Sequence, residues 1–286
     1  RRNNIMIKLI LTLLLLIVIS IAGGGYALYE YLRPEEKPPV LASPSSIRQL
    51  DSGEVIGFQA KQGVHAWQGI PYARPPQGLL RWRAPRAPEP WPGRLQALEF
   101  GSACLQVSSR LREGDDLLRG SEDCLYLNIW APPYVAENVP TGEDALPVMF
   151  WIHGGGNTSG LKDYYDFSEL IRQHQVLVVT INYRLGPMGW FTHPAIQGLQ
   201  SGIDKTSNFG TLDIMEALKW VQANIENFGG DPDNITIFGE SAGGNNVFSL
   251  LASPMGNGLF HKAISQSGYT TSFTKEEAIG IKDRKS

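Results

Sequence analysis

The pentapeptide Gly239-Glu240-Ser241-Ala242-Gly243 constrains the fold of this chain more than any other stretch. Residues 234–238 before it are rich in β-branched side chains, which predicts a short buried strand. Residues 242–252 after it carry apolar side chains at helical spacing. A strand, a Gly-x-Ser-x-Gly turn and a helix in this order are typical of a nucleophile elbow. We therefore predict that Ser241 is a catalytic nucleophile in a strained turn; the alternative is a chance occurrence of the pentapeptide in a loop.

The flanking sequence predicts an α/β sheet. Short apolar runs at residues 125–130, 147–152, 175–181 and 263–267 are predicted strands, and uninterrupted apolar runs are typical of buried parallel strands. Residues 213–227 place apolar side chains on one helical face, and a Gly-Gly-Asp-Pro sequence follows as a stop signal. Strands that alternate with helices indicate an α/β architecture.

The sequence His153-Gly154-Gly155-Gly156 follows the predicted strand at residues 147–152. Acyl transfer passes through a tetrahedral intermediate whose oxygen is negatively charged, and backbone N–H groups stabilise it only where the main chain approaches closely. This glycine pattern supplies such donors in lipases and esterases. We expect the oxyanion donors to be the N–H groups of Gly155, Gly156 and Ala242. A phosphate-binding loop is excluded, because no Lys-Ser/Thr pair follows and there is no Gly-x-Gly-x-x-Gly.

The N-terminal region predicts export from the cytoplasm. Residues 9–29 form an uncharged run long enough to cross a bilayer, with basic residues before it and acidic residues after it. We expect residues 1–31 to be a transmembrane anchor with the rest of the chain outside the cytoplasm, in the periplasm or extracellular space. A signal peptide cleaved near Ala22 is the alternative. Residues 32–46 are then a Pro/Ser-rich linker, and residues 47–286 form the globular domain.

Charge and cysteine content restrict the other functions. The net charge of -3, with no basic stripe, argues against a nucleic-acid partner. The two cysteines are too few for a structural zinc site and too far apart for a Cys-x-x-Cys redox pair. In an exported protein, Cys104 and Cys124 predict one disulfide that closes a surface loop, although two free buried thiols are the alternative.

The chain resembles the type-B carboxylesterase/cholinesterase family of α/β-hydrolases. The resemblance rests on residues 69–73, 121–130, 153–156, 182–186, 228–232 and 238–244. It implies a mostly parallel central sheet with helices on both faces, and a catalytic triad of serine, acid and histidine. It further implies hydrolysis of a small-molecule ester through an acyl-enzyme, a Cys104–Cys124 bridge and no cofactor. We assign no metal ligand and no oligomeric state.

Two residue patterns depart from this family. Asn157 stands after the glycines where family members usually carry an aromatic residue, so we expect a different wall of the acyl pocket. The loop at residues 105–123 contains no aromatic residue. A choline ester is therefore a poor candidate substrate, since no ring there could make a cation–π contact.

The part of the chain after Ser241 does not complete the predicted triad. It contains one histidine, His261, just before a predicted strand, and its acidic residues lie in a polar tail. We therefore expect the chain to carry only the N-terminal part of the domain, without the triad acid and histidine. This fragment alone should have negligible turnover, while the complete protein should be an esterase. A non-catalytic binding or adhesion protein on the same fold is the alternative.

Overall fold

This computed structural model describes residues 23–25, 39–107, 118–270 and 274. The chain divides into two compact units, Arg1–Pro39 and Val40–Ser286. In the first unit, residues 23–25 are helical, and the predicted membrane segment at residues 9–29 otherwise lies outside the described residues. None of the helices within the described ranges is long and apolar enough to cross a membrane. The anchor and the cleaved signal peptide both stay predictions.

The second unit begins at Val40, earlier than the boundary at residue 47 that the composition predicted. Ala42 forms a β-bridge with Phe58, and Pro44–Ser46 form a short 3-10 helix. Ser46 is fully buried, and its hydroxyl accepts the backbone N–H of Gly57 at 2.9 Å. A Pro/Ser-rich composition is typical of linkers, but here the serine hydroxyl satisfies a buried backbone group and fixes the turn onto the domain.

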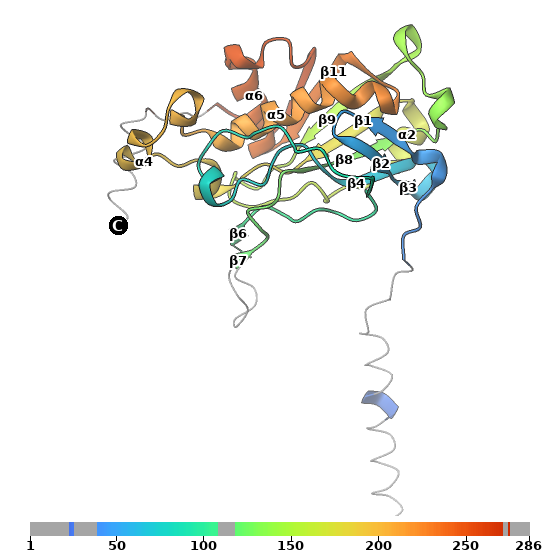
Figure 1. The fold of residues 1–286 in the computed structure, drawn as a ribbon, viewed down its shortest axis with the longest axis horizontal. Helices are drawn as coiled ribbons and strands as arrows, with labels where there is room; N and C mark the ends of the chain where they lie inside the picture. Colours follow the sequence, from blue (N-terminus) through green and yellow to red (C-terminus); the bar gives the residue numbers. More distant parts are fainter. Residues whose placement is uncertain (1–22, 26–38, 108–117, 271–273, 275–286) are drawn as a thin grey trace, which may run out of the picture. The chain divides into compact units, whose positions relative to one another are not determined.

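A seven-stranded mixed sheet forms the centre of this unit, in the order β12-β11-β9-β10-β8-β4-β3 (Figure 1). The first four strands are parallel, whereas β10, β8, β4 and β3 pair antiparallel. The prediction of a mostly parallel sheet is thus corrected to a mixed sheet. β3 and β4 are joined by a turn at Lys61–Gly63, and so short a connection joins only antiparallel strands. The strands are β3 (Phe58–Gln59), β4 (His65–Pro71), β8 (Tyr126–Ala131), β9 (Leu146–Ile152), β10 (Leu177–Ile181), β11 (Gly230–Glu240) and β12 (Lys262–Gln266).

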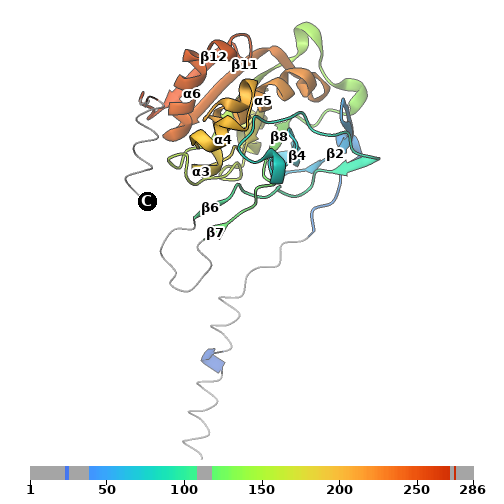
Figure 2. The ribbon, with the colours of Figure 1, turned by 60° about the vertical axis from the view of Figure 1, so that its left-hand side comes forward.

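Helices pack on both faces of the sheet. α5 (Phe209–Asn224) and α6 (Ala242–Ala252) lie side by side over one face (Figure 2), and α2 (Ser168–His174) contributes to the core on the other. All five residues of β10 are buried, and they alternate between the two cores: Val179 packs with α5 and α6, and Val178 with α2. A strand covered on both faces must be apolar throughout, which is why its sequence is an uninterrupted apolar run.

The remaining elements are short. The predicted helix at residues 213–227 is α5 followed by a 3-10 turn, Ile225–Phe228, and Gly229 ends it with φ 93°, as the glycine stop signal indicated. α3 (Gly186–Gly189) and α4 (Pro194–Gly198) lie between β10 and α5. Two small sheets complete the described chain: β1 (Arg48–Leu50) with β2 (Gly53–Ile56) and β5 (Arg94–Gln96), and β6 (Gln106–Val107) with β7 (Leu118–Arg119).

Cys104 and Cys124 form a disulfide, and both residues are buried. This confirms the predicted bridge, and the alternative of two free thiols is wrong. β6 and β7 pair antiparallel just inside the bridge. Closing a loop of about this length stabilises a protein by about 3 kcal/mol in the chain-entropy account.

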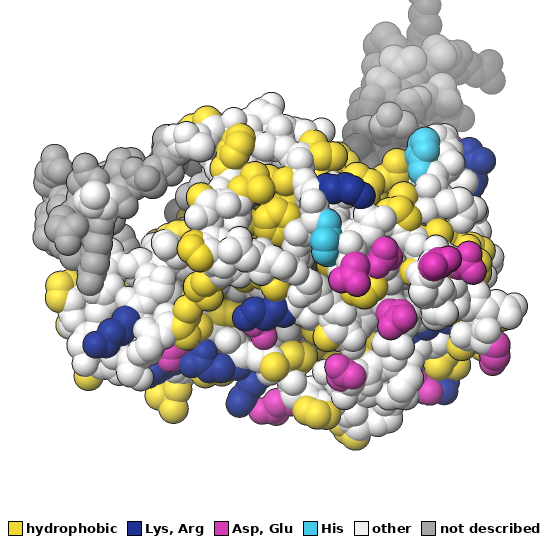
Figure 3. Space-filling model, turned by 90° about the horizontal axis from the view of Figure 1, so that it is seen from above, with side chains coloured by type: hydrophobic (Ala, Val, Ile, Leu, Met, Phe, Trp, Pro, Cys, Tyr) yellow, Lys and Arg dark blue, Asp and Glu magenta, His cyan; other side chains and the backbone are white. Residues whose placement is uncertain are grey.

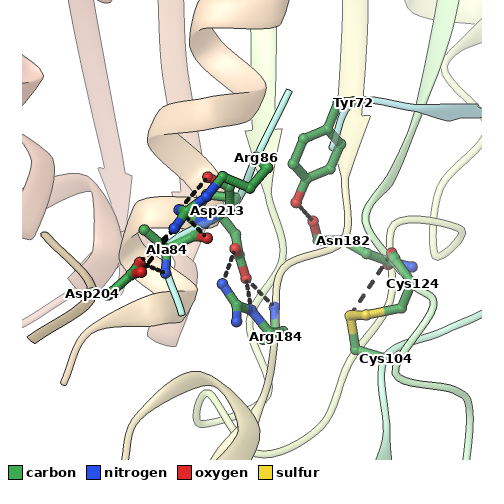
Figure 4. A network of polar contacts seen from close by, with 10 residues as sticks. Tyr72, Ala84, Arg86, Cys104, Cys124, Asn182, Arg184, Asp204 and Asp213 are labelled. Carbon is green, nitrogen blue, oxygen red and sulfur yellow. Dashed lines mark hydrogen bonds and ion pairs between the residues drawn. A yellow bond between two sulfur atoms is a disulfide. The ribbon is translucent and has the colours of Figure 1, made fainter. Parts of the chain in front are cut away.

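A buried ion pair holds the segment after β10 against α5 (Figure 4). Arg184 donates from Nε and Nη2 to the two carboxylate oxygens of Asp213, at 2.8 and 2.6 Å, and its backbone N–H donates to the same carboxylate. Both side chains are almost fully buried. A bidentate pair fixes direction as well as distance, so the neighbouring Tyr183 is held in a defined position.

The face of the molecule in Figure 3 carries acidic and basic side chains interspersed with apolar ones. Its described residues form no continuous basic stripe.

Candidate active site

The register of the sheet brings the elbow (residues 239–243) and the glycine segment (residues 153–156) to the same edge. β9 and β11 are parallel neighbours, with Gly239 opposite Ile152. The residues that follow the two strands therefore leave the sheet side by side. A methyl group at Gly154 would lie 3.2 Å from the Cβ atom of Ser241.

Ser241 has the strained backbone that the pentapeptide predicts. Its φ of 55° and ψ of -120° lie in a region that non-glycine residues rarely adopt. A Cβ atom at Gly239 would come within 2.6 Å of the Gly243 backbone, and one at Gly243 would come within 2.0 Å of the Ile152 carbonyl oxygen. Both glycines are therefore required by close backbone approach. Ser241 is half-buried, and its hydroxyl has no hydrogen-bond partner among the described residues.

The glycine segment leaves its N–H groups available. Gly155 and Gly156 have φ of 96° and 64°, and both residues are exposed. The carbonyl oxygen of Gly155 accepts the backbone N–H groups of Thr158 and Ser159 at 3.1 and 3.0 Å, which ties this carbonyl back into the loop. Within the described ranges, the N–H groups of Gly155 and Gly156 donate to no protein acceptor. They are free to donate to a bound oxygen atom.

Ala242 is the first residue of α6. N–H groups in the first turn of a helix have no partner within the helix, and they carry the positive end of its dipole. The side chain of Ser241, at the N-cap, makes no capping hydrogen bond. The third expected donor therefore has the properties of an anion-binding group.

His153 supports the glycine segment from within the core. It is fully buried, its ring stacks on Tyr183 with centroids 4.4 Å apart, and its Nδ1 lies 2.8 Å from the carbonyl oxygen of Gly154. Burial lowers the pKa of His153 to about 4, so the ring is neutral at physiological pH. A neutral, stacked ring acts as a support for the loop and not as a titrating base.

His261 lies at the wrong end of the sheet to serve Ser241. Its Nδ1 accepts the backbone N–H of Ile235 at 3.0 Å, and the backbone N–H of His261 donates to the Ile235 carbonyl oxygen. Ile235 precedes Ser241 by six residues along β11, which is about 20 Å in an extended strand. His261 therefore does not contact Ser241.

A serine–histidine contact occurs elsewhere, between Ser45 Oγ and His65 Nε2 at 2.9 Å. It is no catalytic triad, because the buried Nδ1 of His65 has no partner among the described residues, where a triad would place a carboxylate. Burial, with the charge of Arg48 as a smaller cause, lowers the pKa of His65 to about 4. His174 ends α2 and His193 caps α4, so all five histidines of the chain are placed, and none of them forms a hydrogen bond with Ser241.

Two supports of the site were missed by the sequence reasoning. The carbonyl oxygen of Gln266, at the end of β12, accepts the backbone N–H of Ser241 at 2.9 Å. The hydroxyl of Tyr183 donates to the His153 carbonyl at 2.6 Å. Both supports are contacts between segments distant in sequence, and no local pattern signals them. Within the described part of the chain, no group of three or more His, Cys, Asp or Glu side chains could hold a metal ion.

The carboxylesterase family model matches residues 44–282 of this chain. The para-nitrobenzyl esterase of Bacillus subtilis (strain 168) is 48% identical over 229 residues, which cover 79% of this chain and 44% of that protein. The fumonisin B1 esterase of Sphingopyxis macrogoltabida is 43% identical over 255 residues, which cover 87% of this chain and 45% of that protein. The chain therefore spans less than half the length of these relatives.

Solved structures give the same result. A PNB esterase structure superposes with a TM-score of 0.72 and 46% identity, covering 83% of this chain and 47% of that one. The carboxylesterase EST55 of Geobacillus stearothermophilus superposes with a TM-score of 0.65 and 39% identity, covering 77% and 43%. These likenesses support the predicted α/β-hydrolase fold. The family match extends over most of the sequence, and the chain belongs to the carboxylesterase family.

Proposed function

We propose that the complete protein is a serine-dependent carboxylic-ester hydrolase with Ser241 as its nucleophile. The observation that carries the proposal is the position of Ser241 in a strained turn, beside the glycine segment with two unengaged backbone N–H groups. Such an arrangement is suited to acyl transfer, because the hydroxyl can attack a carbonyl carbon whose oxygen faces preorganised donors.

The reaction proceeds in two steps. Ser241 Oγ attacks the ester carbonyl and gives up its proton to a base, and the resulting oxyanion is stabilised by the N–H groups of Gly155, Gly156 and Ala242. The C–O bond to the alcohol breaks, the alcohol leaves with the proton, and an acyl-enzyme remains. Water then repeats the sequence and releases the acid. Loss of one such donor in a comparable site costs about 10²–10³ in rate.

The base and its acidic partner are proposed to lie in a part of the protein outside this chain. None of the five histidines bonds to Ser241, and a serine without a base is a weak nucleophile. The fragment alone is therefore expected to have negligible turnover. The two relatives are named for different esters, so the names support a small-molecule ester as substrate without selecting one.

A non-catalytic binding role is the competing proposal, and covalent labelling separates the two. The complete protein should react with a fluorophosphonate probe and hydrolyse a short-chain p-nitrophenyl ester, and Ser241→Ala should abolish both. Ser45→Ala is the matched control, since Ser45 also contacts a histidine ring but lies outside the proposed site. Equal hydrolysis by Ser241→Ala and the unaltered protein would refute the nucleophile.

The disulfide supports a location outside the cytoplasm, where such bonds persist. We propose that the folded domain is exported. Residues 9–29 would tether it to the membrane, or cleavage near Ala22 would release it.

A further inference from the structure

We propose that Asn157 and Asn246 form a positioning pair that fixes the oxyanion loop (residues 153–157) relative to Ser241. The inference rests on the proposed function, because the groups that the pair positions are the proposed nucleophile and oxyanion donors. Asn157 directly follows the three glycines, and Asn246 lies on α6, five residues after Ser241. The pair therefore joins the two halves of the site.

The two amides bond reciprocally. Asn246 Nδ2 donates to Asn157 Oδ1 at 2.9 Å, and Asn157 Nδ2 donates back to Asn246 Oδ1 at 3.4 Å. The Asn246 side chain is buried, so an unpaired amide there would carry a desolvation cost of about 1–3 kcal/mol. An amide side chain offers a donor and an acceptor in one plane, and few other side chains do. The pair is therefore specific to amide side chains.

Two further contacts hold Asn157 in place. Tyr183, whose hydroxyl bonds the His153 carbonyl, also reaches Asn157 Oδ1 at 3.2 Å. The Asn157 carbonyl accepts the backbone N–H of Gly186 at 2.6 Å. Tyr183 thus contacts both ends of the glycine segment, and the buried Arg184–Asp213 ion pair holds the residue that follows it.

The glycine segment needs such anchors because glycine allows the backbone more conformations than any other residue. Asn157 has φ of 56°, a left-handed conformation that asparagine tolerates better than most residues. The amide of Asn157 turns to α6, where Asn246 binds it. The departure from the family pattern at residue 157 therefore indicates a hydrogen-bonded anchor, in addition to a changed pocket wall.

The test uses the complete protein and p-nitrophenyl acetate, with kcat and KM measured separately and the acylation burst followed by rapid mixing. Asn157→Gly removes the amide but allows the positive φ, and Asn246→Ala removes the partner without touching the loop. A displacement of about 1 Å at a catalytic group can cost about 10²-fold, so we expect kcat to fall by about 10- to 100-fold with KM little changed. The double variant should be no slower than the slower single variant, since both remove one interaction.

Asn224→Ala is the matched control, because Asn224 is an equally buried asparagine whose amide makes its bonds away from the proposed site. It donates to the Trp220 carbonyl within α5 and accepts the backbone N–H of Asp51. Asn224→Ala should lower the melting temperature as Asn246→Ala does and leave kcat unchanged. Unchanged kcat in both single variants, or losses that multiply in the double variant, would overturn the pair. Hydrolysis that survives Ser241→Ala would instead refute the proposed function.

Discussion

For Gly243→Ala, helix propensity and packing predict changes of opposite sign in the free energy of unfolding. Gly243 is a buried residue in the first turn of α6, where alanine normally stabilises a helix by about 0.5–1 kcal/mol relative to glycine. A Cβ atom there would lie 2.0 Å from the Ile152 carbonyl oxygen and 3.0 Å from that of His153. Both neighbours are backbone atoms of β9 and of the glycine segment after it, so no flexible side chain can move aside.

Relief of a 2.0 Å contact requires α6 and β9 to separate by about 1 Å, and overpacking of this kind costs about 1–3 kcal/mol. Gly243→Ala should therefore lower the free energy of unfolding by about 2 kcal/mol. In the complete protein it should also lower kcat, because the shift passes directly into the oxyanion loop.

The control is Gly198→Ala at the end of α4, where a Cβ atom would meet nothing within 4 Å. Urea unfolding should show it unchanged or slightly stabilised. If Gly243→Ala is as stable and as active as the unaltered protein, the close approach of elbow and glycine segment is not what fixes this site.

Two further predictions concern buried ionisable side chains. Unfolded histidines titrate near pH 6.5 and the folded pKa of both His153 and His65 is about 4, so the unfolded chain takes up more protons between these values. Stability is complete above pH 6.5 and falls towards pH 4, by about 3 kcal/mol for His153. Urea midpoints at pH 7, 6 and 5 should follow this slope, and His153→Gln should make it shallower while the contribution of His65 remains. Arg184→Met leaves Asp213 buried without its partner and should lower the free energy of unfolding by about 3–5 kcal/mol. Arg172→Ala, which breaks an exposed pair with Glu169, should lower it by under about 1 kcal/mol. Similar losses in the two variants would contradict the burial argument.

Elements whose environment imposes a sequence pattern were predictable. β9 begins one residue before its predicted start and α6 has its predicted bounds, because one is buried on two faces and the other follows a turn with fixed glycine positions. The strained turn at Ser241 and the positive φ angles of Gly155 and Gly156 were predictable for the same reason. Close backbone approach requires glycine, and glycine is visible in a sequence.

Pairing and support were not predictable in the same way. An apolar run gives a strand but not its direction, so the antiparallel placement of β8 beside β10 could not be deduced from residues 125–130. The contacts of Tyr183 and Asn246 with the loop at residues 153–157 join segments that meet only in the folded chain. Their residue types are common, and their role comes from geometry alone.

The strand order also restricts where a base can come from. β12 pairs with β11 so that Lys262 lies opposite Thr236 and Gln266 opposite Glu240, which places His261 at the edge away from the elbow. Ser241 is half-buried, and Gly155 and Gly156 are exposed. All three residues lie at the opposite, carboxyl edge of the strands. In the proposed mechanism, a histidine that takes the Ser241 proton would have to enter from that edge, on a segment that passes the carboxyl ends of β9 and β11. His153 cannot take that place, because its ring is stacked on Tyr183 and its movement would break the support of the loop at residues 153–157.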